Sequence, residues 1–351
     1  MAHATIRDVA REAAVSVATV SRALNGHSNV RPQMRERIEG VAVRLGYVPH
    51  AGARNLSLAR SGAIGVVLPD LHGEFFSELL RGMDRESSAH SLHLMLMVMH
   101  GEAERGIAAL NTMRGRVDGL LVMAPQVSSE KLLERMPVGM PAVLVNCAPH
   151  EAGRAELRVD NAAGAAALVD HLVAQGRRRL VHITGPDGNC DAQERHRGVI
   201  EACTRARIAL RVLPGDFNED SGAAAVATLL ADGWAADAIL AANDMMAIGA
   251  MMALKRGGIS VPGEVAVAGF DDIPLARLIS PSLTTASIDI AQFGADAVAR
   301  LAAVIAGTDS GLIEQRVPIV VPRESTARAA PAAHDSTDNI ARNNGKQGER
   351  P

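Results

Sequence analysis

The stretch TIRDVAREAAVSVATVSRALN, residues 5–25, decides how the N-terminal part of the chain folds. Thr5 stands three residues before Asp8, which is the spacing of a capping box, and apolar residues recur at helical spacing through residue 13. Ser16 follows a short turn and is placed to cap a second helix. The apolar face of this second helix consists of Val20, Ala23 and Leu24. Two helices three residues apart predict a helix-turn-helix.

A third helix is predicted to begin at Pro32 and to end at Gly46. Proline suits the first helical turn because its missing N–H needs no partner there, and glycine accepts the left-handed conformation that ends many helices. The three helices predict a small all-α headpiece over residues 1–48. Residues 49–60 contain few side chains that could form a core, so we expect a hinge, or linker, that becomes helical only conditionally.

From residue 61 onward, short apolar runs alternate with Ala- and Leu-rich amphipathic stretches. This alternation predicts parallel sheets covered by helices. The runs are Ile64–Leu68, Leu94–Val98, Gly119–Met123, Ala142–Asn146, Leu180–Thr184, Ala238–Ala241 and Val265–Gly269. They are too many for one sheet of five or six strands. We therefore expect an α/β core, residues 61–328, made of two Rossmann-like subdomains with a ligand cleft between them.

The charge of the chain is divided unevenly along its length. Residues 1–60 hold nine arginines and four acidic residues, a net charge of +5, whereas the remainder holds 27 basic and 35 acidic residues, a net charge of −8. Only the N-terminal part therefore suits a polyanionic partner.

The sequence also excludes several classes of protein. Charged residues at Arg7 and Asp8 interrupt any signal peptide, and no apolar run approaches the ~20 residues of a membrane span. The three scattered cysteines indicate neither a disulfide framework nor a zinc site. We expect a cytoplasmic protein with no membrane partner, no metal and no cofactor.

Three segments of the N-terminal region resemble the DNA-binding headpiece of the lactose/galactose repressor family of bacterial transcription regulators: Thr5–Ala10, Val15–Asn25 and Leu45–Pro49. Motifs of the core resemble the same family in order and spacing, and they are Val159-Asp160-Asn161, Arg195-x-x-Gly198, Ala242-Asn243-Asp244, Gly269-Phe270-Asp271-Asp272, Leu283-Thr284-Thr285 and Arg323-Glu324-Ser325. The resemblance covers about residues 4–328. It implies a core similar to periplasmic sugar-binding proteins.

The resemblance also implies how the core is divided. We expect an N-subdomain of about residues 61–160 plus 289–328 and a C-subdomain of about 161–288. The tail, residues 329–351, is rich in polar residues and is expected to be disordered. It lacks the leucine heptads of a terminal coiled coil, so we expect homodimers.

The family resemblance implies that the second helix enters the major groove of a near-palindromic operator. Val17 and Ala18 occupy the base-reading positions, where short apolar side chains can touch thymine methyl groups but cannot hydrogen-bond a base. Arg22 is implied to contact guanine, and Leu56 is implied to enter the minor groove. The other implied DNA contacts are Thr5, Ser16, Thr19, Ser21, Asn25, Asn29, Arg31, Tyr47 and Arg54. The alternative is that Thr5 and Ser16 are only helix caps and Arg22 a solvated charge.

Sugar recognition needs carboxylates and amides for paired hydroxyls and an aromatic face for the ring. The residues implied to bind the effector are Asp70, Phe75, Phe76, Asp160, Arg195, Phe217, Asn243 and Asp271. This set favours a neutral polyhydroxylated ligand over a purine. Alternatively, Phe76 and Phe217 are core residues, and Asn243 and Asp271 are caps at strand ends.

The sequence departs from the family at a few positions. Ala14, Met34 and His50 stand where Gly, Thr and Asn are common, and Gly73-Glu74-Phe75-Phe76 replaces a frequent Asn-Pro-Phe-Phe loop. The first two departures concern DNA contacts, whereas the loop leaves the identity of the ligand open.

Two other classes of function compete with a regulator. An enzyme is disfavoured because the chain lacks the G-x-G-x-x-G, Walker, G-x-S-x-G and H-E-x-x-H motifs. A cytoplasmic sugar-binding module without a DNA role is disfavoured by the basic N-terminal region. We expect a repressor of carbohydrate uptake or catabolic genes whose operator affinity is controlled allosterically by a small sugar-like effector.

Overall fold

The computed structural model describes residues 4–25, 29–47, 60–99, 108, 110–148, 154–233, 235–309 and 311–327. The chain forms two compact units: unit 1 is Met1–Asp70, Met83–Glu156 and Ala295–Ile313, and unit 2 is Leu71–Gly82, Leu157–Gly294 and Glu314–Pro351. The predicted hinge up to residue 59, with Arg54 and Leu56, and the predicted disordered tail lie outside the described residues. None of the helices in the described ranges is long and apolar enough to cross a membrane.

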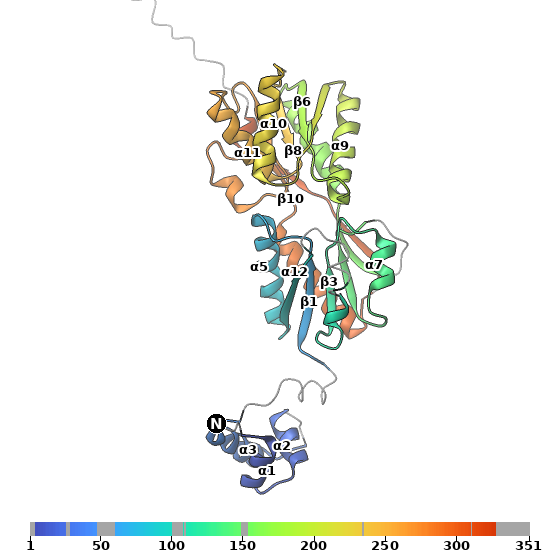
Figure 1. Cartoon of the computed structure of the whole chain (residues 1–351), viewed down its shortest axis with the longest axis vertical. Helices are drawn as coiled ribbons and strands as arrows, with labels where there is room; N and C mark the ends of the chain where they lie inside the picture. Colours follow the sequence, from blue (N-terminus) through green and yellow to red (C-terminus); the bar gives the residue numbers. More distant parts are fainter. Residues whose placement is uncertain are drawn as a thin grey trace, which may run out of the picture. The chain divides into compact units, whose positions relative to one another are not determined.

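Three helices form the headpiece, as predicted (Figure 1): α1 (Ile6–Glu12), α2 (Val17–Leu24) and α3 (Pro32–Leu45). Their buried side chains form one small core, which consists of Val9, Ala10, Ala13, Val20, Ala23, Ile38, Val41 and Ala42. Pro32 and Gly46, with a φ of 64°, bound α3 where the sequence placed them. The headpiece therefore has an apolar centre of its own.

The turn between α1 and α2 shows how Ala14 is accommodated. Ala14 has a φ of 52°, in the left-handed region that favours glycine. Its N–H donates to the carbonyl of Arg11 at 3.2 Å, and the N–H of Val15 donates to the carbonyl of Ala10 at 3.0 Å. These two bonds form a Schellman motif, which keeps the turn despite the methyl group.

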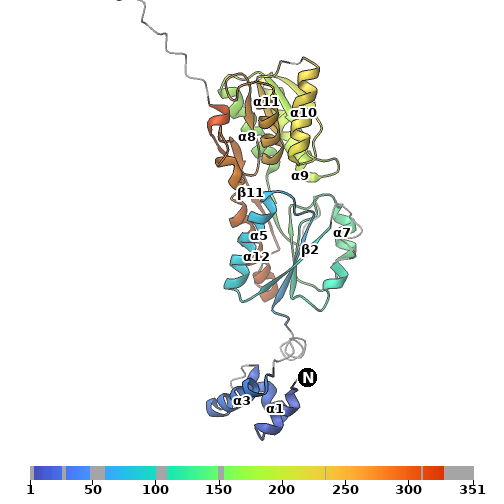
Figure 2. The same ribbon diagram turned by 60° about the vertical axis from the view of Figure 1, so that its left-hand side comes forward.

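A six-stranded sheet has the strand order β11-β5-β4-β3-β1-β2, and its strands β1, β2, β3 and β4 lie within unit 1. Its strands are β1 (Ala63–Leu68), β2 (His93–Val98), β3 (Gly119–Val122), β4 (Ala142–Val145), β5 (Ala155–Val159) and β11 (Ile313–Arg316). The first four pair in parallel. Figure 2 shows α5 (Glu74–Ala89) and α12 (Ile290–Ala306) on one face of this sheet and α7 (Ser129–Arg135) on the other.

Unit 2 contains a four-stranded parallel sheet of order β7-β6-β8-β9. Its strands are β6 (Arg179–Ile183), β7 (Ala209–Leu213), β8 (Ala238–Ala241) and β9 (Ala266–Ala268). The helices α8 (Asn161–Ala174) and α9 (Cys190–Ala206) pack together, as do α10 (Glu219–Ala231) and α11 (Asp244–Arg256). Two short antiparallel strands, β10 (Thr285–Ser287) and β12 (Ile319–Val321), form a third sheet.

All seven apolar runs predicted as strands are strands of the structure, namely β1, β2, β3, β4, β6, β8 and β9. Two parallel sheets covered by helices confirm the predicted α/β core. Strands β5, β7, β10, β11 and β12 were not predicted. Several candidate effector residues follow the carboxyl ends of parallel strands, which is where open α/β sheets bind ligands.

Candidate functional site

Helix α2 has one buried face, with Val20 and Ala23, and one solvent-exposed face. Ser16 caps the helix, since its Oγ accepts the N–H of Thr19 at 3.1 Å. Val17 is 42% exposed, and Ala18 and Arg22 are also exposed. The Arg22 Nε–H makes only a 3.3 Å bond to the carbonyl of Ala18, on the same helix. The three residues implied to read bases are therefore accessible together.

Other residues implied to contact DNA have structural partners in the headpiece. The N–H and the hydroxyl of Thr5 donate to Asp8 Oδ2 at 3.0 and 2.7 Å, and these bonds lower the pKa of Asp8. Asn25 Nδ2 donates to Ser21 Oγ at 3.3 Å. Tyr47 is partly buried against the headpiece core. These side chains therefore contribute to the structure of the headpiece.

The remaining headpiece residues of the predicted set lie on its surface or near it. Thr19 is partly buried, and its hydroxyl lies 2.9 Å from that of Ser16. Asn29 and Arg31 are exposed just before α3. All of the predicted DNA-contacting residues except Arg54 and Leu56 thus lie within the described headpiece.

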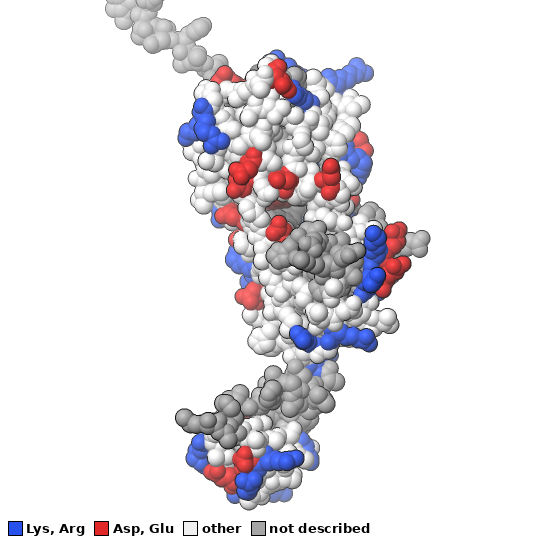
Figure 3. All heavy atoms as spheres, viewed as in Figure 1, with Lys and Arg blue, Asp and Glu red and all other residues white. Residues whose placement is uncertain are grey.

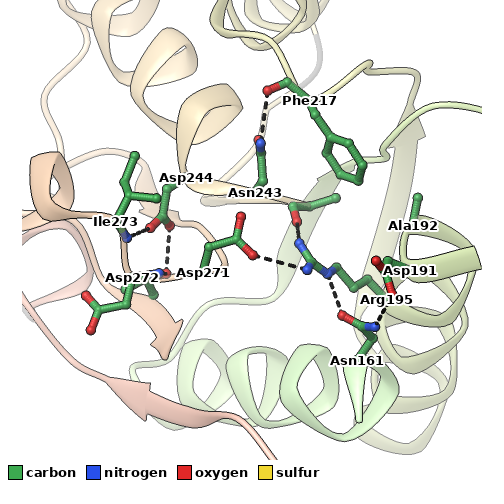
Figure 4. A network of polar contacts seen from close by, with 12 residues as sticks. Asn161, Asp191, Ala192, Arg195, Phe217, Asn243, Asp244, Asp271, Asp272 and Ile273 are labelled. Carbon is green, nitrogen blue, oxygen red and sulfur yellow. Dashed lines mark hydrogen bonds and ion pairs between the residues drawn. The ribbon is translucent and has the colours of Figure 1, made fainter. Parts of the chain in front are cut away.

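Unit 2 contains a buried polar network centred on Arg195 of α9 (Figure 4). The Arg195 Nε–H donates to Asn161 Oδ1 at 2.8 Å, one Nη donates to the carbonyl of Ala242 at 2.5 Å, and the other donates to Asp271 Oδ1 at 3.1 Å. Arg195 is only 6% exposed. Its guanidinium lies over the ring of Phe270, with Cζ 3.8 Å from the ring centroid. The arginine is thereby held in one orientation.

Three of the five N–H groups of the Arg195 side chain are used in these bonds. The other two have no acceptor among the described residues. A guanidinium held by buried partners, with donors to spare, is a preorganised group for oxygen atoms of a ligand.

Asn161 connects Arg195 to a second carboxylate. Its Nδ2 donates to Asp191 Oδ1 at 2.8 Å, and its Oδ1 accepts from Arg195. Burial raises the pKa of Asp191 to about 7, although the charge of Arg195 opposes that shift. Burial likewise raises the pKa of Asp271 to about 6, again against the effect of Arg195. The network thus contains two carboxyl groups, those of Asp191 and Asp271, and one guanidinium, that of Arg195.

The loop after β9 has an unusual backbone. Asp271 and Asp272 have φ angles of 111° and 62°, and such conformations cost about 1–3 kcal/mol each in L residues. The Asp272 carboxylate pairs with Arg323 at 2.5 Å. The consecutive side chains thus have different arginine partners, and these two ion pairs fix the strained dipeptide.

Asp244 stabilises the same loop from the first turn of α11. Its Oδ1 accepts from the hydroxyl of Thr285 at 2.6 Å, and its Oδ2 accepts the N–H of Ile273 at 2.9 Å. Burial raises the pKa of Asp244 well above its ordinary value. Since both oxygens are bonded to the protein, Asp244 is a positioning residue.

Two of the predicted effector residues are helix caps. Asn243 Oδ1 accepts the N–H of Met246 at 3.0 Å at the start of α11, while its Nδ2 donates to the carbonyl of Phe217 at 2.9 Å. Asp160 Oδ1 accepts the N–H of Ala163 at the start of α8. Asn243 therefore also positions the loop that carries Phe217.

The aromatic residues of the predicted set are only partly buried. Phe217 has a φ of 72°, and the centroid of its ring lies 5.9 Å from the Arg195 guanidinium carbon. Phe75 and Phe76, on α5, contact each other edge to face with centroids 5.2 Å apart. Asp70 is exposed after β1. Of the eight predicted residues, the structure brings Arg195, Phe217, Asn243 and Asp271 together in unit 2.

Sequence reasoning missed Asn161, Asp191 and Phe270 as members of this network. Asp191 stands four residues before Arg195, so the two share one face of α9, which is a signal that helical periodicity could have supplied. Gly198, in the Arg195-x-x-Gly198 motif, has a structural reason. A Cβ at Gly198 would lie 2.2 Å from the carbonyl oxygen of Ala162, so glycine allows the close approach of α9 to α8.

Among the described residues, no group of three or more His, Cys, Asp and Glu side chains is arranged to hold a metal ion. Around Arg195, the described side chains offer hydrogen bonding, ion pairing and ring stacking.

Two family models match the chain: "Bacterial regulatory proteins, lacI family" over residues 5–50, and "Periplasmic binding protein-like domain" over residues 169–326. The chain is 34% identical over 329 residues to the HTH-type transcriptional regulator GalS of Salmonella typhimurium, covering 92% of this chain and 96% of that protein. It is 34% identical over 289 residues to the ribose operon repressor of Escherichia coli, covering 80% and 87%.

A solved structure of the lac repressor dimer bound to operator and the anti-inducer ONPF is similar with a TM-score of 0.85 and 27% identity, covering 93% of this chain and 99% of that chain. These relatives are transcriptional regulators, and each is matched over most of its length. With its helix-turn-helix headpiece and periplasmic-binding-protein-like core, this chain belongs to the lacI family of bacterial regulatory proteins and is a DNA-binding transcriptional regulator.

Proposed function

We propose that this chain represses carbohydrate-uptake or catabolic genes and that a small sugar-like effector controls its affinity for a near-palindromic operator. The observation that carries the proposal is the buried Arg195, held by three hydrogen bonds while two of its N–H groups have no partner among the described residues. The names of the relatives, which include a ribose operon repressor, support a sugar as the effector class.

The proposed effector binds through charge-assisted hydrogen bonds. The two remaining Arg195 N–H groups donate to ligand oxygens, while Asp271 and Asp191 each accept from hydroxyl groups through the carboxylate oxygen that makes no bond to the described protein. The ring of Phe217 covers an apolar C–H face of the ligand. Asn243 and Asp244 act indirectly, by positioning the loops. Because two carboxylates outnumber one guanidinium, this site suits a neutral polyol and disfavours a phosphorylated one.

The proposed operator contact is made by α2. Arg22 donates to guanine, Val17 and Ala18 touch base edges, and Ser16 and Thr19 hold phosphates. One headpiece reads few base pairs, so we propose a homodimer on two half-sites. Leu56, outside the described residues, is proposed to enter the minor groove between the half-sites.

Effector and operator influence each other through one coupling free energy. The effector shifts affinity for DNA only as far as it binds the two functional conformations differently, typically by about 1–3 kcal/mol. The protein would act in the cytoplasm, by binding rather than by catalysis.

The test selects bound fragments of the source genome with the full-length chain and then adds candidate sugars to the bound complex. We expect a near-palindrome beside sugar-uptake or catabolic genes, with one sugar changing its affinity. The sign of that change distinguishes an inducer from a corepressor. If the chain retains no fragment at moderate salt yet binds a sugar, the function is that of a sugar-binding module and the repressor proposal is wrong.

A further inference from the structure

A second basic surface lies where the chain enters the core, outside the headpiece. Arg60 and Arg114 line a cavity of about 320 Å³ in unit 1, and both residues are exposed. Asp118 also lines this cavity. Figure 3 shows basic side chains gathered at the end of the core where β1 begins. The cavity therefore has two guanidiniums and one carboxylate.

The one carboxylate of this cavity is engaged with the backbone that follows the hinge. Asp118 Oδ1 accepts the N–H and the hydroxyl of Ser61 at 2.5 and 2.9 Å, and its Oδ2 accepts the N–H of Gly62 at 2.8 Å. These three bonds tie the residues directly after Arg60 to the start of β3. Asp118 thereby fixes the backbone directly after Arg60, and the surface is basic because the two guanidiniums outnumber this single carboxylate.

Chain length places this surface close to DNA. Arg60 comes four positions after Leu56 in the chain. Because a fully extended chain spans at most about 3.6 Å per residue, the two Cα atoms are within about 14 Å of each other. With Leu56 in a minor groove about 6 Å wide, the phosphates that border the groove lie within reach of a long side chain at residue 60. Arg114 lines the same cavity as Arg60.

We propose that Arg60 and Arg114 form a phosphate-binding surface of the core, the core phosphate surface, which contacts the backbone of DNA beside the hinge. This inference rests on the proposed function, because it needs the hinge at the DNA. The contact carries no sequence information. It adds salt-dependent affinity and fixes the core relative to the operator, in the way that phosphate contacts position a protein on a duplex.

The experiment measures the affinity of the full chain for its operator and for a scrambled duplex as a function of salt concentration. For R114A we expect the slope of log affinity against log salt to fall by about 1 per protomer, about 2 for a dimer, because each phosphate contact releases about 0.9 counterion. This decrease is expected on the operator, where the hinge is proposed to lie in the minor groove. R114K keeps the charge and should retain most of the slope.

The matched control is R256A, which removes an exposed arginine from the end of α11. Its salt slope should equal that of the unmodified protein. Equal unfolding midpoints for R114A, R114K and R256A show that the variants are folded. If R114A has the salt slope of R256A on the operator, the core phosphate surface does not exist.

Failure of this inference differs from failure of the proposed function. If the unmodified chain prefers its operator and loses that preference in R22A, yet R114A changes nothing, only the core phosphate surface is overturned. If the unmodified chain shows no operator preference, both proposals are overturned together.

Discussion

Helix α2 and the network around Arg195 each contain an arginine, in opposite surroundings. Arg22 is exposed and makes one long bond to its own helix, whereas Arg195 is 6% exposed and bonds to partners from three other segments. An exposed charge contributes little to stability and is free to meet a new partner. A buried one must be matched inside the protein, so its removal disturbs the fold as well as the site.

The two regions also differ in how far apart along the chain their residues lie. The proposed base-reading residues lie within six positions of one another on one helix. The Arg195 network takes its members from α8, α9, the end of β8 and the loop after β9. We therefore expect changes at the exposed base-reading residues to affect DNA binding alone, and changes in the network to affect stability and effector binding together.

The largest effect is expected for R195A. At pH 8, where Asp271 and Asp191 are mostly charged, this change leaves two buried carboxylates without their cation and should destabilise unit 2 by about 3–5 kcal/mol. Urea unfolding at that pH measures the loss, and the effector response should disappear. R256A, which removes an exposed arginine, should change stability by less than about 0.5 kcal/mol. A stability of R195A equal to that of R256A would contradict the buried network.

R22A should have the next largest effect, and on specificity only. Loss of a guanine contact should reduce the preference for operator over scrambled DNA by about 1–3 kcal/mol, measured by competition binding. The unfolding midpoint should not move, because Arg22 is exposed. R37A, on the exposed side of α3, serves as the control. An R22A protein that keeps its operator preference would remove Arg22 from the reading set.

The buried carboxylates predict an inverted pH dependence. The pKa of Asp191 is raised to about 7 from an ordinary 3.8, so between about pH 4 and 7 the folded state binds more protons here than the unfolded state. The contribution of Asp191 to stability is therefore full below pH 4 and decreases as pH rises toward 7.

D191N removes this titration. Between pH 5 and 7 the unmodified protein should lose about 2 kcal/mol more stability than D191N, since the folded state holds most of one extra proton over this range and each pH unit then corresponds to about 1.4 kcal/mol. Urea unfolding at the two pH values measures the difference. Parallel decreases in the two proteins would show that Asp191 titrates at its ordinary pKa.

The smallest effect is expected for S16A. The change removes the oxygen that accepts the Thr19 N–H, and loss of such a cap typically costs about 1 kcal/mol of helix stability. Hydrogen exchange at the Thr19 amide should become faster. S16N, which retains a capping oxygen, should preserve the protection. Equal exchange in S16A and the unmodified protein would mean that the cap does not stabilise α2.

The elements that the sequence predicted are those with local signals. Pro32 and Gly46 bound α3, and the continuous apolar runs became buried strands. Strands β5 and β7 were missed because Glu156, Arg158 and Arg211 interrupt their apolar residues. β7 is an edge strand, so alternate side chains can face solvent. In β5, the buried main chain of Glu156 is satisfied by Arg300, 144 residues away.

The candidate effector site shows the same division. Motifs led to Arg195 and Asp271, but they did not reveal that Asn161 joins Arg195 to Asp191, because these residues meet only when α8 packs on α9. Nor could they separate the two roles of Asn243, which is a helix cap and a support for the Phe217 loop.

By itself, the sequence determined the helix-turn-helix, the basic N-terminal region and the alternation of strands and helices, because capping, charge and periodicity act over a few residues. Only the tertiary structure decided which polar groups share a buried space. It decided that two N–H groups of Arg195 have no acceptor among the described residues, whereas both carboxylate oxygens of Asp244 accept hydrogen bonds from the protein. The physical reason is that the state of a buried charge depends on every partner within a few ångströms, and those partners come from distant parts of the chain.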